Sequence, residues 1–526
     1  MNSKLFIIAG CGAWYLTFLL GFFILAPSTD DSYYTITSLG TALTGNPGLW
    51  IGDEFAPAFF LPSAFTYFYG LLFKLTMIFG FNFGPFGFRF YQFLFIFLLP
   101  VLIALMLRRT NPSDYAIRLL LLLTCLSLTH FVQSAATVRP EVLGVLLFIG
   151  FLLLRGEPFK RETSSAFVLA LSGIVHPVFT LLSGAVFVTV LLRLFKQRVL
   201  NKLSKWLSFV SAFAIPFVAL GIYYLSNLSA FRQQTLGRAE FLSTDIWTTP
   251  AVIWGNILFW NNPAGLEFGL FGGYPAVVLV IVMSVSTWLV FHRKAYLWDD
   301  EILWVCFPVL FVQWFVFLLL PPFLPYLAFS SFLASLNIVL LVQMPKASFF
   351  DKRLTWIISA GGMLLCLVFV GFQGGKFLLV PGERLTPSGL YSVMSPLLED
   401  DEAELYTSNA RLIPPLIDYF SENGDIKLNL TYLSPHCLHG DLLKRANHHS
   451  LSIMPSSDVS STYWGIDRRL ASQTQEGGLS FMMKGSQTNV TLESADQIYS
   501  DDKNLIIRAS SFSVQTDHQT CIGVND

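Results

Sequence analysis

Long apolar runs separated by short polar or basic segments dominate the first 370 or so residues. The first run, Leu5 to Ala26, carries no charge and is about as long as a helix that crosses a bilayer core, which takes roughly 20 residues. Further membrane helices are predicted over Arg89–Leu107, Tyr115–Phe131, Val138–Leu154, Trp206–Leu228, Tyr274–Phe291, Ile302–Leu320, Phe323–Val342 and Leu354–Phe372. The pattern therefore predicts an all-α polytopic membrane protein.

Basic residues indicate which ends of these runs face the cytoplasm. Lys and Arg cluster at 108–109, 155–161, 193–205, 293–294 and 346–353. Short cytoplasmic loops carry an excess of these residues. With all five clusters inside, the chain makes about eleven passages, and we expect a cytoplasmic N-terminus and an extracytoplasmic C-terminus.

Two apolar segments do not fit a single crossing. Treating Phe55 to Phe81 as a span would move Arg108 outside, so we expect an interfacial or partly re-entrant helix there. Ser164 to Phe195 is basic at both ends and must turn back near His176-Pro177. Each half would hold about 15 residues and reach roughly 22 Å, short of a core of about 30 Å. The turn is therefore expected below the outer surface.

The composition becomes polar and acidic at about residue 374. Strands are predicted at Ala403–Ser408, Ile426–Leu433, Leu479–Met483 and Leu505–Ala509, with a short helix at Pro414–Phe420. We expect a transmembrane domain over 1–373, with an external loop over 27–88, and a small extracytoplasmic α/β domain over 374–526. In that domain Cys437 and Cys521 either form a disulfide or remain separate thiols.

Composition excludes several classes of protein. Residues are 54% hydrophobic and only 13% charged, whereas soluble domains carry roughly 25% charged residues. The net charge of -1 gives no basic surface for nucleic acid. The cytoplasmic loops are short and contain no glycine-rich phosphate motif. An enzyme that works outside cannot use cytoplasmic nucleotides, so its activated substrate should arrive on a lipid.

Polar residues gather instead at the predicted outer ends of the helices. They are Asp30 and Asp31, Asp53 and Glu54, Arg139 and Glu141, His176, and a later loop with Arg232 and Arg238. Ionisable residues at membrane depth are candidates for function by default. We therefore expect the reaction to take place on the outer side.

Several of these motifs resemble one family. An acidic pair followed by aromatic residues (Asp30-Asp31-Ser32-Tyr33-Tyr34), Arg139-Pro140-Glu141 before a helix, a His176-Pro177 turn and the segment Pro321–Tyr326 are similar to motifs of the GT-C glycosyltransferases. The resemblance is closest to bacterial relatives of protein O-mannosyltransferases and lipid A aminoarabinose transferases. It covers about the first 200 residues, and the late helices by topology only.

The resemblance implies a reaction and a location. A sugar would pass, with inversion, from a polyprenyl-phosphate donor to a lipid, glycan or protein acceptor, at the outer face of a bacterial inner membrane. Lys74 is not next to a proline, as the phosphate-binding lysine of the aminoarabinose transferases is, so that role is not transferred to it. A lipid-linked glycan transporter or flippase, or an O-antigen polymerase or ligase, remains the alternative.

Direct displacement requires a base for the acceptor proton and cations for the leaving phosphate. Asp30 is the expected base, because desolvation and repulsion by Asp31 would both make it a stronger one; a simple helix-end role is the alternative. Arg139 matches a phosphate in geometry, although an arginine at the membrane boundary can also reach toward the lipid headgroups. His176 is the second expected donor-phosphate ligand.

The remaining candidates are expected to bind substrate. They are Tyr33, Asp53, Glu54, Glu141, Arg232 and Arg238. Glu141 would equally well complement the dipole of its helix. Asp53 and Glu54 could form a divalent-metal site together with Asp31, but acceptor binding or solvation explains them as well, so no cofactor is firmly expected.

Overall fold

The computed structural model describes part of the chain. Residues 3–24, 29–51, 54–59, 61–81, 84–110, 112–129, 131, 135–155, 162–196, 203–229, 231–232, 274–293, 303–319, 324–342 and 387–398 are described, together with ten strands after residue 402. The chain forms two compact units. The helical unit comprises Met1–Gly21, Gln92–Ser226 and Arg238–Gln373, and the loop-and-sheet unit comprises Phe22–Tyr91, Asn227–Gly237 and Gly374–Asp526.

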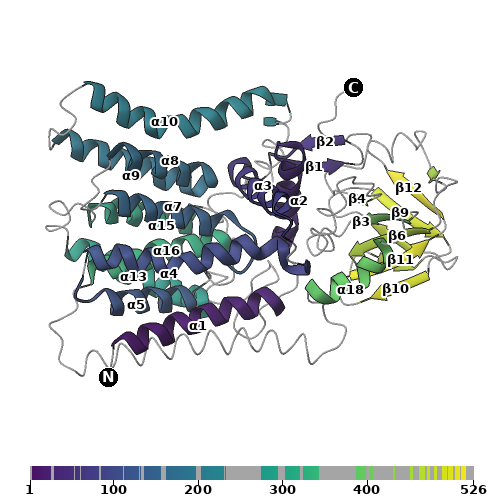
Figure 1. The fold of residues 1–526 in the computed structure, drawn as a ribbon, viewed down its shortest axis with the longest axis horizontal. Coiled ribbons are helices and arrows are strands. Elements are labelled where there is room, and N and C mark those ends of the chain that lie inside the picture. The colour runs from purple at the N-terminus through teal and green to yellow at the C-terminus, as the bar shows by residue number, and fades with distance from the viewer. Residues whose placement is uncertain are drawn as a thin grey trace. The chain divides into compact units, whose positions relative to one another are not determined.

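The helical unit is a bundle of apolar helices that run side by side (Figure 1). Its helices are α1 (Ser3–Ile24), α4 (Phe90–Thr110), α5 (Tyr115–Ser127), α7 (Pro140–Arg155), α8 (Glu162–Val175), α9 (Pro177–Lys196), α10 (Leu203–Ser226), α13 (Tyr274–His292), α15 (Cys306–Leu319) and α16 (Leu324–Leu341), with the short 3-10 helix η3 (Leu303–Val305) before α15. These confirm the predicted helices as helices. The predicted helix Leu354–Phe372 lies outside the described residues.

Three of the described helices are long and apolar enough to cross a membrane, namely Phe86–Thr110, Pro177–Lys196 and Ser204–Ser226. The other apolar helices of the bundle have shorter described apolar stretches. The structure therefore supports a mostly helical membrane protein, while the total of eleven passages stays a prediction.

Helix α16 is buried along almost its whole length and is joined to its neighbours by polar side chains. Ser330 Oγ donates a hydrogen bond to the Gln313 carbonyl (3.1 Å), and Ser286 Oγ donates to Gln313 Oε1 (3.2 Å). Arg118 on α5 donates to the Val339 and Leu340 carbonyls at the C-terminal end of α16. Such bonds are a common way to join helices where lipid removes the hydrophobic driving force.

The predicted hairpin is present, with α8 and α9 packed together and His176 between them. The expectation of two halves of about 15 residues holds for α8, which has 14, but is wrong for α9, which has 20. The reason is that the turn does not lie at the midpoint of the apolar run. At 1.5 Å per residue α9 reaches about 30 Å, enough to cross a bilayer core.

The external loop folds into two helices and a hairpin. These are α2 (Thr29–Thr44), β1 (Gly48–Ile51), β2 (Glu54–Pro57), α3 (Ser63–Ile78) and the 3-10 helix η1 (Gly84–Arg89). Helices α2 and α3 meet closely at Gly70, where an added Cβ would lie 2.4 Å from the Ser38 carbonyl oxygen. One face of α3 exposes apolar residues, namely Tyr67, Phe68, Leu71, Leu75 and Ile78, which agrees with an interfacial helix.

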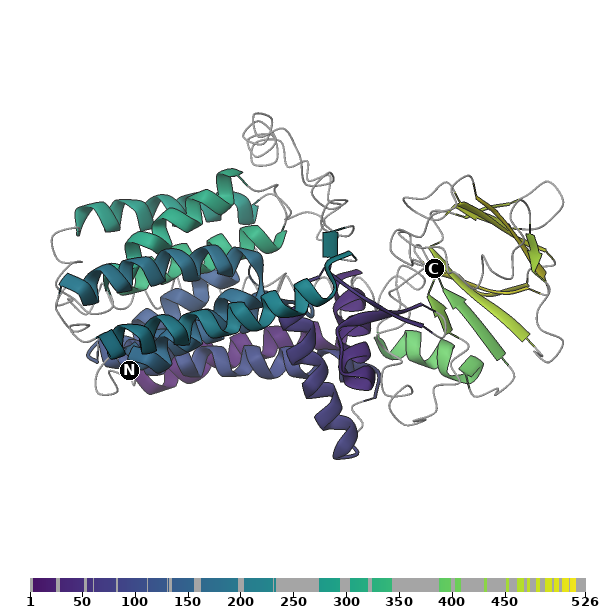
Figure 2. The same cartoon turned by 90° about the horizontal axis from the view of Figure 1, so that it is seen from above.

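The C-terminal part contains helix α18 (Pro387–Leu398) and two five-stranded sheets (Figure 2). The first sheet has the order β10-β11-β6-β3-β4 and the second β5-β12-β9-β8-β7. The strands are β3 (Ala403–Thr407), β4 (Leu430–Tyr432), β5 (Leu451–Ile453), β6 (Ser461–Asp467), β7 (Ala471–Gln473), β8 (Leu479–Met482), β9 (Thr488–Glu493), β10 (Asp496–Ser500), β11 (Asn504–Ala509) and β12 (Ser511–Thr516).

This part holds more strands than the sequence predicted. β3, β4, β8 and β11 coincide with predicted strands, whereas the other six strands and α18 were missed. β3 pairs in parallel with β4 and β6, and the other described pairings of these two sheets are antiparallel. The predicted helix Pro414–Phe420 and both Cys437 and Cys521 lie outside the described residues.

Candidate active site

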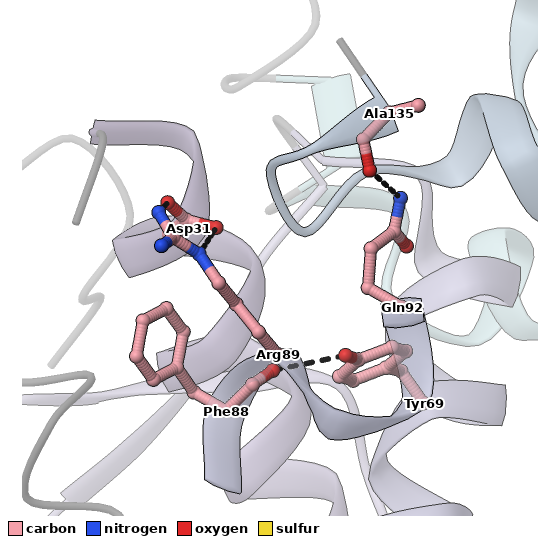
Figure 3. Close-up of polar contacts among 6 residues, drawn as sticks. All are labelled: Asp31, Tyr69, Phe88, Arg89, Gln92 and Ala135. Carbon is pink, nitrogen blue, oxygen red and sulfur yellow. Dashed lines mark hydrogen bonds and ion pairs between the residues drawn. The ribbon is translucent and has the colours of Figure 1, made fainter. Parts of the chain in front are cut away.

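A buried ion pair joins the start of the external loop to its end (Figure 3). Asp31 lies in the first turn of α2, and Arg89 is the last residue of η1. Arg89 Nη2 donates to Asp31 Oδ2 at 2.6 Å, and Nε donates to Oδ1 at 3.3 Å. The two side chains are 1% and 0% exposed. Both carboxylate oxygens of Asp31 are therefore engaged by one guanidinium.

Neighbouring contacts fix the backbone that carries Arg89. The Tyr69 hydroxyl of α3 donates to the Phe88 carbonyl at 2.9 Å, and the Arg89 guanidinium lies 5.0 Å from the centre of the Phe88 ring. Tyr91 donates from its hydroxyl to the Leu72 carbonyl of α3 at 2.8 Å. The chain is thus tied to α3 on both sides of Arg89, through Phe88 at the end of η1 and Tyr91 at the start of α4, which orients the guanidinium before any ligand binds.

The pair changes how the acidic motif is interpreted. The sequence places Asp31 beside Asp30 at the predicted outer end of a helix, and the structure shows that Asp31 is fully buried and ion-paired. The physical reason is that Arg89 supplies the counter-charge without which a buried carboxylate would be too costly. Asp30 belongs to the same first turn of α2, and its side chain lies outside the described residues.

A second ion pair lies in the helical unit, where α7 begins. Arg139 immediately precedes Pro140, the first residue of α7. Its Nε donates to Glu141 Oε2 at 3.1 Å and its Nη2 to Oε1 at 3.3 Å, with both side chains buried. Upstream, Gln92 Nε2 on α4 donates to the Ala135 carbonyl at 3.1 Å (Figure 3). The segment that leads to Arg139 is therefore held to α4.

His176 joins this second cluster from the α8–α9 turn. Its side chain is buried, with 8% of the residue exposed. Its Nδ1 accepts a hydrogen bond from the Val178 backbone N–H at 3.3 Å, which caps α9. An accepting Nδ1 places the proton of the neutral ring on Nε2. His176 also interacts electrostatically with Glu141, and its ring lies 6.1 Å from that of Tyr326.

These contacts bring together the N-terminal ends of three helices. Arg139 precedes α7, His176 precedes α9, and Tyr326 lies in the first turn of α16. Each helix N-terminus carries a partial positive charge of about half a unit. We call Arg139, Glu141, His176 and Tyr326 the helix-start cluster. It combines a guanidinium, an imidazole and helix dipoles in a setting that suits an anion.

The other predicted site residues are less well placed or not described. Tyr33 is half-buried on α2, and Arg232 is exposed. Glu54 lies in β2 opposite Ile51, and its side chain is not among those described. Asp53 and Arg238 lie outside the described residues. Among the described residues, no three His, Cys, Asp or Glu side chains come together as they would around a metal ion.

Two residues of the site were not assigned from the sequence. Arg89 was taken only as the start of a membrane helix, yet it lies at the predicted outer end, where the positive-inside rule makes an arginine unusual. Tyr326 belongs to the segment noted for its family resemblance, but no role had been given to it.

The architecture, a bundle of apolar helices and a loop-and-sheet unit, defines the class of fold, and one solved membrane-protein structure shares this fold. No family model and no curated protein sequence matches the chain. The structure resembles that of ArnT from Cupriavidus metallidurans bound to undecaprenyl phosphate, with a TM-score of 0.51 and 12% identity over 96% of this chain and 97% of that one.

Two further solved structures are similar at lower scores. ArnT from Cupriavidus metallidurans in the apo state has a TM-score of 0.44 and 12% identity over 96% of this chain and 97% of that one. The arabinosyltransferase EmbB from Mycobacterium smegmatis has a TM-score of 0.34 and 13% identity over 98% of this chain and 64% of that one. The resemblance to the GT-C fold that the sequence motifs predicted is thus confirmed at the level of the fold by the first structure.

Proposed function

We propose that this protein transfers a sugar from a polyprenyl-phosphate carrier to an acceptor at the extracytoplasmic face of the membrane, with inversion at the sugar. The observation that carries the proposal is the helix-start cluster. Its guanidinium, its imidazole and three helix N-termini gather among apolar helices. A lipid phosphate offers the matching chemistry, an anionic head on a hydrocarbon chain.

In this proposal Arg139 and His176 bind the donor phosphate. A guanidinium forms paired hydrogen bonds with phosphate oxygens, and the Nε2–H of a neutral His176 can donate one more. Glu141 already accepts from two nitrogens of Arg139, which sets the orientation of the guanidinium plane. Because these groups favour a phosphate dianion over a diester, they assist its departure as a leaving group.

The acidic pair divides its tasks in this proposal. Asp31 is held by Arg89 through both oxygens, which makes it a firm anchor for the first turn of α2. Asp30 is the proposed base. It removes the proton of the acceptor hydroxyl while that oxygen bonds to the anomeric carbon and the bond from this carbon to the phosphate oxygen breaks. Polyprenyl phosphate leaves with the electron pair.

The fold supports this proposal. A protein with the same fold over nearly its whole length binds undecaprenyl phosphate. The basic clusters along the sequence support an orientation in which Asp30, Arg139 and His176 all lie on the outer side of a bacterial inner membrane. Glu54, Asp53, Tyr33, Arg232 and Arg238 remain proposals for contacts with the sugar or the acceptor.

Reconstituted protein and a labelled polyprenyl-phosphate sugar test the function. Purified protein in liposomes is given the donor together with a membrane extract that supplies acceptors, and the lipid products are separated. Transfer predicts label-free polyprenyl phosphate in amounts equal to the sugar moved to acceptor. Movement of intact donor between leaflets without cleavage would indicate a flippase instead and would refute the proposal.

A further inference from the structure

The C-terminal part of the loop-and-sheet unit touches the segment that ends in Arg89. Helix α18 packs against η1 on one side and against β3 of the first sheet on the other. Leu390 of α18 is 1% exposed, and Phe88 of η1 is 0% exposed. The residue after Phe88 is Arg89, the partner of Asp31. α18 therefore lies between the sheet and the backbone of the ion pair.

A second contact reaches the other partner of the pair. β4, the edge strand of the first sheet, contacts β1 of the external loop, and β1 in turn contacts α2. Asp31 lies in the first turn of α2. The same sheet thus meets the loop at two places, one leading to Arg89 through α18 and η1 and one leading to α2 through β1.

We infer that the C-terminal domain positions the Asp31–Arg89 pair, and that Leu390 is the positioning residue through which α18 sets η1. This inference rests on the proposed function for its effect on turnover. Tyr69 of α3 holds η1 through the Phe88 carbonyl, Tyr91 holds the following start of α4 to α3, and α18 contacts η1 from the C-terminal domain. Loss of that support frees the segment that fixes the guanidinium.

The geometry of the pair explains why a small movement of η1 matters. Nitrogen–oxygen hydrogen bonds have lengths of about 2.7 to 3.2 Å and weaken steeply with misalignment. Arg89 Nε is already 3.3 Å from Asp31 Oδ1, while Nη2 is 2.6 Å from Oδ2. A shift of even a few tenths of an ångström would turn the two-bond pair into a single contact. The first turn of α2, with Asp30, would then lose its fixed orientation.

The test combines a structural measurement with kinetics on the full-length protein. Leu390→Ala is compared with Leu390→Met, which keeps the volume, and with Ser392→Ala, an exposed position on the same helix. Hydrogen exchange is followed by mass spectrometry over residues 84–89 and 29–44, and over Asn504–Ala509 as a report on the fold of the sheet. Turnover is measured with the labelled polyprenyl-phosphate sugar.

We expect Leu390→Ala to speed exchange in both loop segments, to leave Asn504–Ala509 as in the wild type, and to lower turnover by about 10- to 100-fold, the size of effect that small misplacements produce. Leu390→Met and Ser392→Ala should behave like the wild type. In an Arg89→Ala background Leu390→Ala should cause no further loss, because both changes act on one pair.

Three outcomes would overturn the inference. They are unchanged exchange over both loop segments in Leu390→Ala, faster exchange over Asn504–Ala509 in every Leu390 variant, and a loss of turnover that multiplies with that of Arg89→Ala. If the wild-type protein does not cleave the donor at all, the proposed function fails. The exchange measurement then still decides whether α18 positions η1.

Discussion

The two buried ion pairs differ in how far apart their partners lie along the chain. Asp31 and Arg89 are 58 residues apart and join α2 to η1, whereas Arg139 and Glu141 are two residues apart at the start of one helix. The first pair can form only when the external loop has folded. The second can form as soon as the first turn of α7 does.

Because of this difference, the two arginine–carboxylate pairs have different structural roles. A buried pair is weak evidence for stability, because desolvation offsets most of its attraction, but removing one partner leaves a costly isolated charge. The Asp31–Arg89 pair therefore couples the fold of the external loop to the positions of these two side chains. The Arg139–Glu141 pair fixes only the plane of one guanidinium, which is what binding a phosphate requires.

The largest expected effect comes from breaking the long-range pair. Arg89→Ala leaves Asp31 buried without a counter-charge, and we expect a loss of about 3 to 5 kcal/mol in the free energy of unfolding together with a loss of turnover. Thermal unfolding in detergent measures the first. Arg108→Ala, at the exposed far end of α4, is the control and should change neither. An Arg89→Ala protein as stable as the wild type would contradict the structural role.

The second prediction separates the two acidic residues. Asp30→Asn should lower turnover by about 10² to 10⁴-fold, as expected for loss of a general base, with donor KM and thermal stability nearly unchanged. Asp31→Asn should lower thermal stability, because it removes the charge that Arg89 is paired with. Steady-state kinetics and melting curves check both. Turnover of Asp30→Asn within a few-fold of the wild type would move the role of base to Asp31 or Asp53.

A smaller effect is expected at the helix-start cluster. His176→Ala removes both the imidazole and the cap on α9, and a lost cap costs about 1 kcal/mol. His176→Asn keeps an oxygen that can cap the helix. Both variants should raise donor KM by about 10- to 100-fold, because each loses a hydrogen bond to a charged group. Only His176→Ala should also unfold at a lower temperature. Equal donor KM in His176→Asn and the wild type would exclude the imidazole from donor binding.

Much of the helical unit could be predicted because its signals are local. An uncharged run such as Leu5–Ala26 predicts a helix by itself. The basic residues at both ends of Ser164–Phe195 predict the turn near His176. The C-terminal strands were harder. β5 and β7 have three residues each, too few to show a period of two, and their pairing depends on partners far along the chain.

The sequence predicts contacts between candidate residues that are close together along the chain, but not contacts between residues that are far apart. Arg139 and Glu141 are two residues apart in the sequence, so their place at the start of a helix could be predicted. Nothing in the sequence connects Asp31 to Arg89, since the hairpin and α3 intervene and only the folded loop brings the two charges together. The burial of His176 depends likewise on its contact with Tyr326 from a distant helix.

Binding of undecaprenyl phosphate to purified protein tests most directly the claim that the helix-start cluster holds a lipid phosphate. The variant Arg139→Gln with Glu141→Gln removes both charges of the local pair without leaving one isolated. Its control is Arg155→Gln, a buried arginine at the other end of the same helix α7. We predict that the double variant weakens binding of the radiolabelled lipid by at least about tenfold, and that Arg155→Gln binds as the wild type does. Equal affinity of the double variant and the wild type would contradict the account.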